Sequence, residues 1–116
     1  MNRRHRLRGR GRFLALRRQG VEVRRGALRL RALATAAPFT RCGLAVMGTR
    51  SAVERNLVKR RLRELVRPRV AEAGGRDVLV AISAAAGGAP FTVLERDVRA
   101  AWAEMERRVQ GSAVPS

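Results

Sequence analysis

Basic side chains concentrate in the segment AVERNLVKRRLRELVR, residues 52 to 67. At about 100° per residue, a helix here would separate apolar residues from cations. The apolar half would hold Val53, Leu57, Val58, Leu62, Leu65 and Val66. The other half would hold one row of Arg55, Lys59, Arg63 and Arg67 and an adjoining row of Asn56 and Arg60. The pattern predicts a helix with one buried apolar face and one exposed basic face.

The basic rows suit phosphate chemistry. Like charges four residues apart on a helix repel by a few tenths of a kcal/mol per pair, so helix stability does not explain them. Arginine donates two parallel hydrogen bonds to a phosphate, and asparagine can hydrogen-bond a base edge or a ribose hydroxyl. These residue types favour structured RNA or DNA over an acidic protein as the partner.

The charge of the whole chain points the same way. The 116 residues include 26 Lys and Arg against 9 Asp and Glu, and Lys59 is the single lysine. Residues 1–69 hold 21 basic and 3 acidic side chains, whereas residues 70–116 hold 5 and 6. A GC-rich genome would explain arginine in place of lysine, but not the excess of both over acids. A polyanion is therefore expected to meet the first two thirds of the chain.

Groups that perform catalysis are scarce. One histidine (His5), one cysteine (Cys42) and two separated aspartates do not make a conventional metal or acid-base centre. We predict no catalytic and no metal-binding side chain in the protein. Cys42 lies in an apolar run and has no partner for an intrachain disulfide, which indicates a buried thiol in an intracellular protein. The chain is predicted to be a binder, so in an enzyme another component would carry the chemistry.

The elements that must position these residues alternate along the chain. The predicted elements are a helix at 11–20, strands at 28–33 and 41–47, a helix from about 52 to 67, a strand at 77–82 and a helix at 91–109, with room for a short strand at 21–25. Ser51 or Thr49 would cap the basic helix, and Pro68 would end it near Arg67. The fold class is α+β in a single domain, with a basic arm at 1–8 and a flexible tail at 110–116.

Three expectations concern packing. The strands at 28–33 and 41–47 are expected to pair as an antiparallel hairpin, and the apolar run RCGLAVM at 41–47 is typical of a central strand. The segment SAAAGGAP, residues 83 to 90, is expected to be a flexible loop. In the last helix, Trp102 belongs to an apolar stripe and is predicted to pack in the core.

The segment RNLVKRRLRE, Arg55 to Glu64, resembles the Arg-Asn-x-x-Lys-Arg-x-x-Arg signature of the bacterial ribonuclease P protein component. The preceding RSAVERN and the early HRLRGRGRF are also similar to that family, and the likeness runs from about His5 to Arg108. It implies a small two-layer α/β sandwich with a left-handed βαβ crossover, in the order α-β-β-(β)-α-β-α. Generic rules of chain connection predict the opposite hand.

The resemblance also implies a function. In that family the RNA subunit cleaves the 5′ leader from precursor tRNA with Mg²⁺ bound by the RNA or at its interface, and the protein assists. The implied partners are the catalytic RNA and precursor tRNA, in the bacterial cytoplasm, with no membrane and no obligatory protein partner. The implied contacts to the catalytic RNA are Arg55, Asn56, Lys59, Arg60, Arg63 and Arg67. The implied leader cleft uses Phe13, Arg17, Arg29 and Arg31.

The sequence departs from the family in that cleft. Arg17 stands one helical turn after Phe13, where the family commonly has a second aromatic, and Arg31 stands where a strand aromatic is usual. The lysine pair that normally follows the central strand is replaced by the short segment MGTR. These departures predict leader contacts that depend more on phosphate pairing than on base stacking.

Two other classes share some of these features. A structural RNA-binding protein of ribosomal type would show the same charge and the same lack of catalytic groups, but would not affect precursor processing. A DNA-binding helix module could place the Arg/Asn helix in a major groove. The flanking strands and the lack of a preceding helix at helix-turn-helix spacing argue against DNA.

Overall fold

The computed structural model describes residues 5–72 and 74–110. Its elements are α1 (Arg10–Gln19), β1 (Val21–Arg25), β2 (Leu28–Ala34), β3 (Arg41–Met47), α2 (Ala52–Glu72), β4 (Arg76–Ser83), α3 (Ala84–Gly87) and α4 (Phe91–Gln110). The strands form one sheet in the order β1-β2-β4-β3. The predicted α+β class and element order are confirmed, including the short strand at 21–25.

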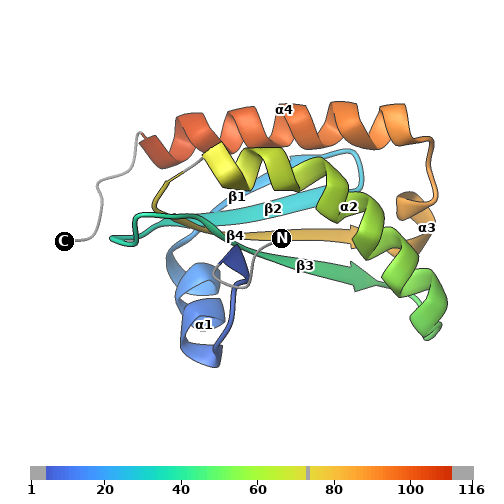
Figure 1. Cartoon of the computed structure of the whole chain (residues 1–116), viewed down its shortest axis with the longest axis horizontal. Coiled ribbons are helices and arrows are strands. Elements are labelled where there is room, and N and C mark those ends of the chain that lie inside the picture. The colour runs from blue at the N-terminus through green and yellow to red at the C-terminus, as the bar shows by residue number, and fades with distance from the viewer. Residues whose placement is uncertain (1–4, 73, 111–116) are drawn as a thin grey trace.

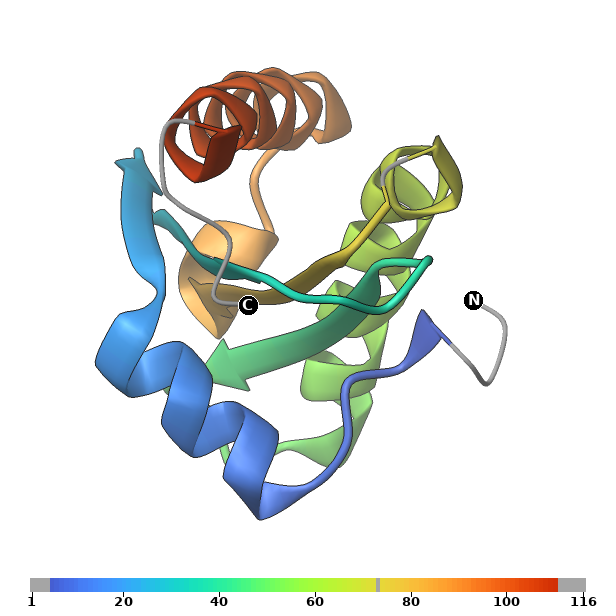
Figure 2. The same cartoon turned by 90° about the vertical axis from the view of Figure 1, so that its left-hand side faces the viewer.

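The long helices α2 and α4 cover one face of the sheet, and α1 lies against the other (Figures 1 and 2). Alternation along the strands produces this division. Val78, Val80 and Ile82 of β4 point into the core beneath the two long helices and are buried. Leu79 and Ala81 point to the face on which α1 lies. That second face is only partly covered, so it remains accessible beside α1.

β4 is the centre of the sheet. It pairs antiparallel with β2 and parallel with β3, from Arg41↔Asp77 to Met47↔Ser83. The expected hairpin between residues 28–33 and 41–47 is therefore wrong. The local hairpin joins β1 to β2, where Gly26 takes the left-handed φ of 58° in the two-residue turn.

β3 is an edge strand, which corrects the expectation that it is central. Its apolar character has a different cause. α2 packs on one face of β3, and the N-terminal segment covers part of its free edge. Arg6 forms a parallel bridge with Cys42, and Leu7 N donates to Cys42 O at 3.1 Å. The buried positions, Cys42 and Val46, belong to the core cluster beneath α2, so packing of this helix on the strand face accounts for them.

The parallel pair β3 and β4 is joined through α2 by a left-handed crossover, as the family resemblance implies (Figures 1 and 2). α2 returns over the sheet at its β3 side, while α4 packs on β1 and β2. The basic helix is therefore placed along the edge of the sheet.

The course of α2 differs from the prediction at both ends. The helix continues through Pro68 to Glu72. Pro68 costs one backbone hydrogen bond, but continuation buries Val70 in the core. Near the start, Val53 and Leu57 were expected to be buried and are 81% and 56% exposed, because the core face begins only at Val58.

The core confirms the apolar stripe of α4. Its buried members are Leu94, Val98, Ala101, Trp102, Met105 and Val109. The segment expected to be a flexible loop after β4 instead forms the single turn α3, which packs on α2. Ser83 caps this turn by accepting a hydrogen bond from Ala86 N. Arg61 donates to Gly87 O at 2.7 Å, which links α2 to α3.

The expected arm and tail fall partly outside the described residues, at 1–4 and 111–116. Within the arm, residues 5–8 run beside β3, and Leu7 is buried. His5 Nδ1 lies 2.8 Å from Thr40 O. Among the helices that the structure describes, none has the length and apolarity needed to cross a membrane.

Gly87→Ala is expected to lower the free energy of unfolding by about 1–3 kcal/mol. The added Cβ would lie 2.4 Å from Cγ1 of Val58, a stiff side chain in a helix. Urea denaturation measures the change. Gly88→Ala is the control, because its nearest neighbour would be Ala85 O at 3.5 Å. Val58→Ala in the Gly87→Ala background should restore stability, and a further loss would contradict the clash.

Burial raises the pKa of the Cys42 thiol from 9.0 to about 12. The unfolded chain releases this proton at lower pH than the folded chain, so the thiol contributes a loss of stability as the pH rises from 9 to 12. We expect Cys42→Ala to show a shallower fall in unfolding free energy across this window. In wild type, maleimide labelling at neutral pH should require unfolding; rapid labelling of the folded protein would contradict burial of Cys42.

Candidate nucleic-acid interface

The start of α2 is fixed by its own side chains. Ser51 Oγ accepts from Glu54 N at 3.1 Å, and Thr49 Oγ1 donates to Glu54 Oε2 at 2.9 Å. Thr49 Oγ1 also accepts from Ser51 N at 3.0 Å. Both predicted capping residues therefore act, and they hold the first turn of the basic helix in register with the end of β3.

The predicted basic rows lie on the outer side of α2. Asn56, Arg60 and Arg67 are exposed, whereas Arg55, Lys59 and Arg63 are half-buried. Two of the cations have partners: Arg55 Nη1 reaches Thr49 O at 3.5 Å, and Arg67 lies 3.6 Å from Glu64. Arg61, which the helical pattern placed at the boundary, contacts α3 instead and lies outside the rows. The helix thus presents six predicted polar residues on one continuous side.

A groove runs between α1 and the open face of the sheet; we call it the sheet groove. Its volume is about 290 Å³. Its lining consists of Phe13, Leu16, Arg17, Arg29, Arg31, Ala45, Met47, Leu79 and Ala81. All four residues predicted for the second site therefore meet in one place. The sequence prediction missed the apolar floor formed by β3 and β4, because it did not know which strands are neighbours.

Phe13 is a partly exposed member of the sheet-groove lining. Phe13 and Arg17 are one turn apart on α1, so both side chains reach the groove, while Leu16 is buried against the sheet. Phe13 is 39% exposed. It is therefore not a core residue, and its ring is available to a planar partner.

A second depression, the edge groove, joins α2 to the sheet groove. It measures about 540 Å³ and is lined by Arg6, Leu7, Phe13, Cys42, Gly43, Leu44, Ala45, Lys59, Arg63 and Leu79. Phe13, Ala45 and Leu79 belong to both grooves. Lys59 and Arg63 of the basic helix thus share one surface with the arginines of the sheet groove, across the narrow strip of β3.

α1 is held on the sheet by a partly buried ion pair. Arg12 Nη1 donates to Asp77 Oδ2 at 3.0 Å, and the Asp77 side chain is buried at the start of β4. At the other end of α1, Arg31 Nη1 donates to Arg17 O at 3.1 Å. These two contacts fix both ends of the helix that forms the wall of the sheet groove.

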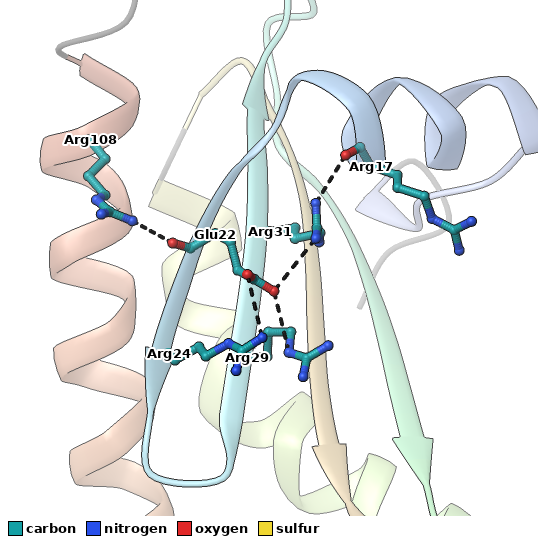
Figure 3. A network of polar contacts seen from close by, with 6 residues as sticks. All are labelled: Arg17, Glu22, Arg24, Arg29, Arg31 and Arg108. Atoms are coloured by element: carbon teal, nitrogen blue, oxygen red, sulfur yellow. Dashed lines mark hydrogen bonds and ion pairs between the residues drawn. The ribbon is translucent and has the colours of Figure 1, made fainter.

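An acidic residue that the sequence analysis did not single out lies among the groove arginines (Figure 3). Glu22 stands directly across from Arg31 in the β1–β2 pair. Its carboxylate lies 3.4 Å from Arg29, 3.6 Å from Arg31 and 3.7 Å from Arg24. The alternation of Glu22 and Arg24 in VEVRR was the available signal, but the cross-strand partner required the register.

Charge is sorted between the two faces. On the side of α4, acids of the helix pair with sheet arginines: Glu104 lies 3.5 Å from Arg25, and Glu106 lies 3.1 Å from Arg76. On the groove side, Glu22 is the acid that faces the strand arginines. The uncompensated positive charge is therefore greatest along the grooves and α2. Within residues 5–72 and 74–110, no three His, Cys, Asp or Glu side chains gather as a metal site would need.

Comparison with known proteins identifies the family and the fold. The family model for ribonuclease P matches residues 1–106. The ribonuclease P protein of Staphylococcus aureus superposes with a TM-score of 0.73 at 19% identity, covering 84% of this chain and 92% of that one. The Thermotoga maritima protein gives 0.70 at 22% identity, covering 88% and 96%. No curated protein sequence matches this chain. On the family match, the chain belongs to the ribonuclease P protein family and is a protein subunit of that endoribonuclease.

Proposed function

We propose that the protein binds the catalytic RNA of ribonuclease P through α2 and the 5′ leader of precursor tRNA through the sheet groove. In this role it assists the hydrolytic, endonucleolytic removal of the leader by the RNA. The observation that carries the proposal is the shared strip of Phe13, Ala45 and Leu79, which joins the basic helix to the arginine-lined groove. A protein with this surface can contact two RNA strands side by side.

The residues of α2 suit a folded RNA. Arg55, Lys59, Arg60 and Arg63 supply phosphate donors on a rigid scaffold, and the exposed Asn56 supplies a donor and an acceptor for a base edge or ribose. The caps at Ser51 and Thr49 hold the first turn in place before binding. Preorganised cations lose less entropy when they bind a phosphate.

The sheet groove suits an extended single strand. Its floor is apolar and its rim carries Arg17, Arg29 and Arg31, so a strand can place its backbone on the rim. Phe13 offers one ring for base stacking, which tolerates any base. Phosphate contacts from arginines also carry no sequence information, so both features suit leaders of differing sequence.

The contribution to catalysis follows from charge. Two RNA strands that approach each other repel through their phosphates, and a basic protein between them reduces that repulsion. Phosphate oxygens are among the hard ligands that Mg²⁺ prefers, so we assign Mg²⁺ to the RNA or to its interface. Lower repulsion should let the complex bind its substrate and Mg²⁺ more tightly. We place this activity in the bacterial cytoplasm, where tRNA precursors are made.

The alternative is a structural RNA-binding protein of ribosomal type. It would use the same basic helix, but it would have no need for a groove joined to that helix. Its signature would be tight RNA binding without any effect on precursor cleavage. The experiment below separates the two roles.

Arg55→Ala/Arg60→Ala is expected to weaken binding to ribonuclease P RNA at least about tenfold. The number of counterions released on binding, read from the salt dependence of the affinity, should fall by about two. The assay is cleavage of 5′-labelled precursor tRNA by a bacterial ribonuclease P RNA at low Mg²⁺ and near-physiological salt. Wild type should restore cleavage and the variant should not. Arg96→Ala/Arg99→Ala removes the same charge from α4 and should retain activity. RNA binding without rescue by wild type would support the structural role.

In the sheet groove, Phe13→Ala and Arg31→Ala should each weaken binding of precursor tRNA by about tenfold, with mature tRNA as the control ligand. The two effects should differ in their response to salt. The Arg31 effect should shrink as salt rises, because it removes a phosphate contact, and the Phe13 effect should persist, because stacking is not screened. Equal losses with mature tRNA would place the leader elsewhere.

A further inference from the structure

Glu22 occupies an unusual position for a carboxylate on a surface offered to RNA. It lies on β1, next to the groove arginines of β2, and its backbone carbonyl accepts from Arg108 of α4 (Figure 3). Its Oε1 atom is buried and has no hydrogen-bond partner. That same atom is the one nearest to Arg29 and Arg31, at 3.4 and 3.6 Å. The carboxylate is therefore enclosed by cations without forming a good hydrogen bond to them.

The geometry leaves the arginines with unused binding capacity. Each guanidinium has five N–H donors, and Arg29 and Arg31 keep 46% and 31% of their side chains exposed. Arg31 also donates to Arg17 O, which fixes it against α1. The Arg17 guanidinium points away from this cluster (Figure 3). One carboxylate thus faces three cations, Arg24, Arg29 and Arg31. The cluster therefore keeps a net positive charge beside the groove.

We propose that Glu22 is a positioning residue that serves as the resident counter-ion of a phosphate seat formed by Arg29 and Arg31. A phosphodiester of an extended RNA strand takes over the pairing of these arginines and adds the hydrogen bonds that Glu22 lacks. This inference rests on the proposed leader groove. Glu22 sets how strongly that groove attracts RNA, because every strand that enters must compete with a carboxylate already present.

The direction in which neutralising Glu22 should change the affinity for RNA follows from this role. Glu22→Gln keeps the shape of the side chain and removes its charge, so the seat becomes more positive. Pairs at this degree of exposure contribute little to folding, so loss of the ion pairs should not disturb the hairpin. Binding of a leader-bearing substrate should become tighter. If Glu22 only stabilised the pairing of the strands, its substitution would weaken this binding instead.

The test measures the affinity of the reconstituted holoenzyme for precursor tRNA and for leaderless tRNA across a salt series. For precursor, Glu22→Gln should tighten binding about three- to tenfold at low salt and steepen the salt slope by up to about one counterion. Leaderless tRNA should show no change. Glu22→Asp retains the charge and should keep the wild-type slope.

The control variant is Glu104→Gln. It makes the same charge change and breaks a pair of similar length, 3.5 Å to Arg25, but it lies on α4 over the opposite face. Its effect on precursor binding should stay below about twofold, as expected for a screened distant charge. An equal effect from both variants would mean that only net charge matters, and would overturn the proposal.

A double-mutant cycle completes the test. In an Arg29→Ala/Arg31→Ala background, Glu22→Gln should have no effect, because the seat is gone. Suppose that the arginine variant weakens precursor binding, but that Glu22→Gln in the wild-type background leaves precursor binding unchanged or weakens it. The counter-ion role then fails while the leader groove stands. If the arginine variant binds precursor as wild type does, the proposed groove itself fails.

Discussion

The position of β4 in the middle of the sheet determines most of the remaining structure. β4 pairs with β2 on one side and β3 on the other, although β2 and β3 are the nearer pair in sequence. Because β3 and β4 are parallel, the chain must return across the sheet between them, and α2 is that return. The left-handed path places α2 along the β3 edge (Figure 2). The basic helix and the open sheet face thereby become neighbours.

Charge and packing divide the molecule in the same way. α4 covers the core with an apolar stripe and supplies acids that pair with sheet arginines, such as Glu106 with Arg76. The groove face has few acids, and its arginines stand beside an apolar floor. The acids of α4 therefore compensate the sheet arginines beneath that helix, while α2 and the groove face keep their positive charge available to a polyanion. This arrangement reconciles a net charge of +17 with a packed core.

The sheet groove also shows how a site can change its chemistry while its place in the fold stays the same. Arg17 and Arg31 occupy positions where the family resemblance implied aromatics, and both line the groove with Phe13. Compared with an aromatic residue, an arginine at such a position offers less stacking area but adds hydrogen-bond donors for phosphate. Its long side chain must also be fixed in place by a neighbouring group. Arg31 donates to Arg17 O, so the substituted residue is fixed against α1.

The sequence by itself determined the elements apart from α3, the two faces of the basic helix from Val58 onward, the core role of Trp102, and the cations, Asn56 and Phe13 of the candidate sites. Periodicity and charge are local properties, and they record which side of an element is buried. The tertiary structure alone decided that β4 lies between β2 and β3, that α2 continues beyond Pro68, that Val53 and Leu57 are exposed, and that Glu22 faces Arg29 and Arg31. These outcomes depend on contacts between residues far apart in the chain, whose free energies no local pattern contains.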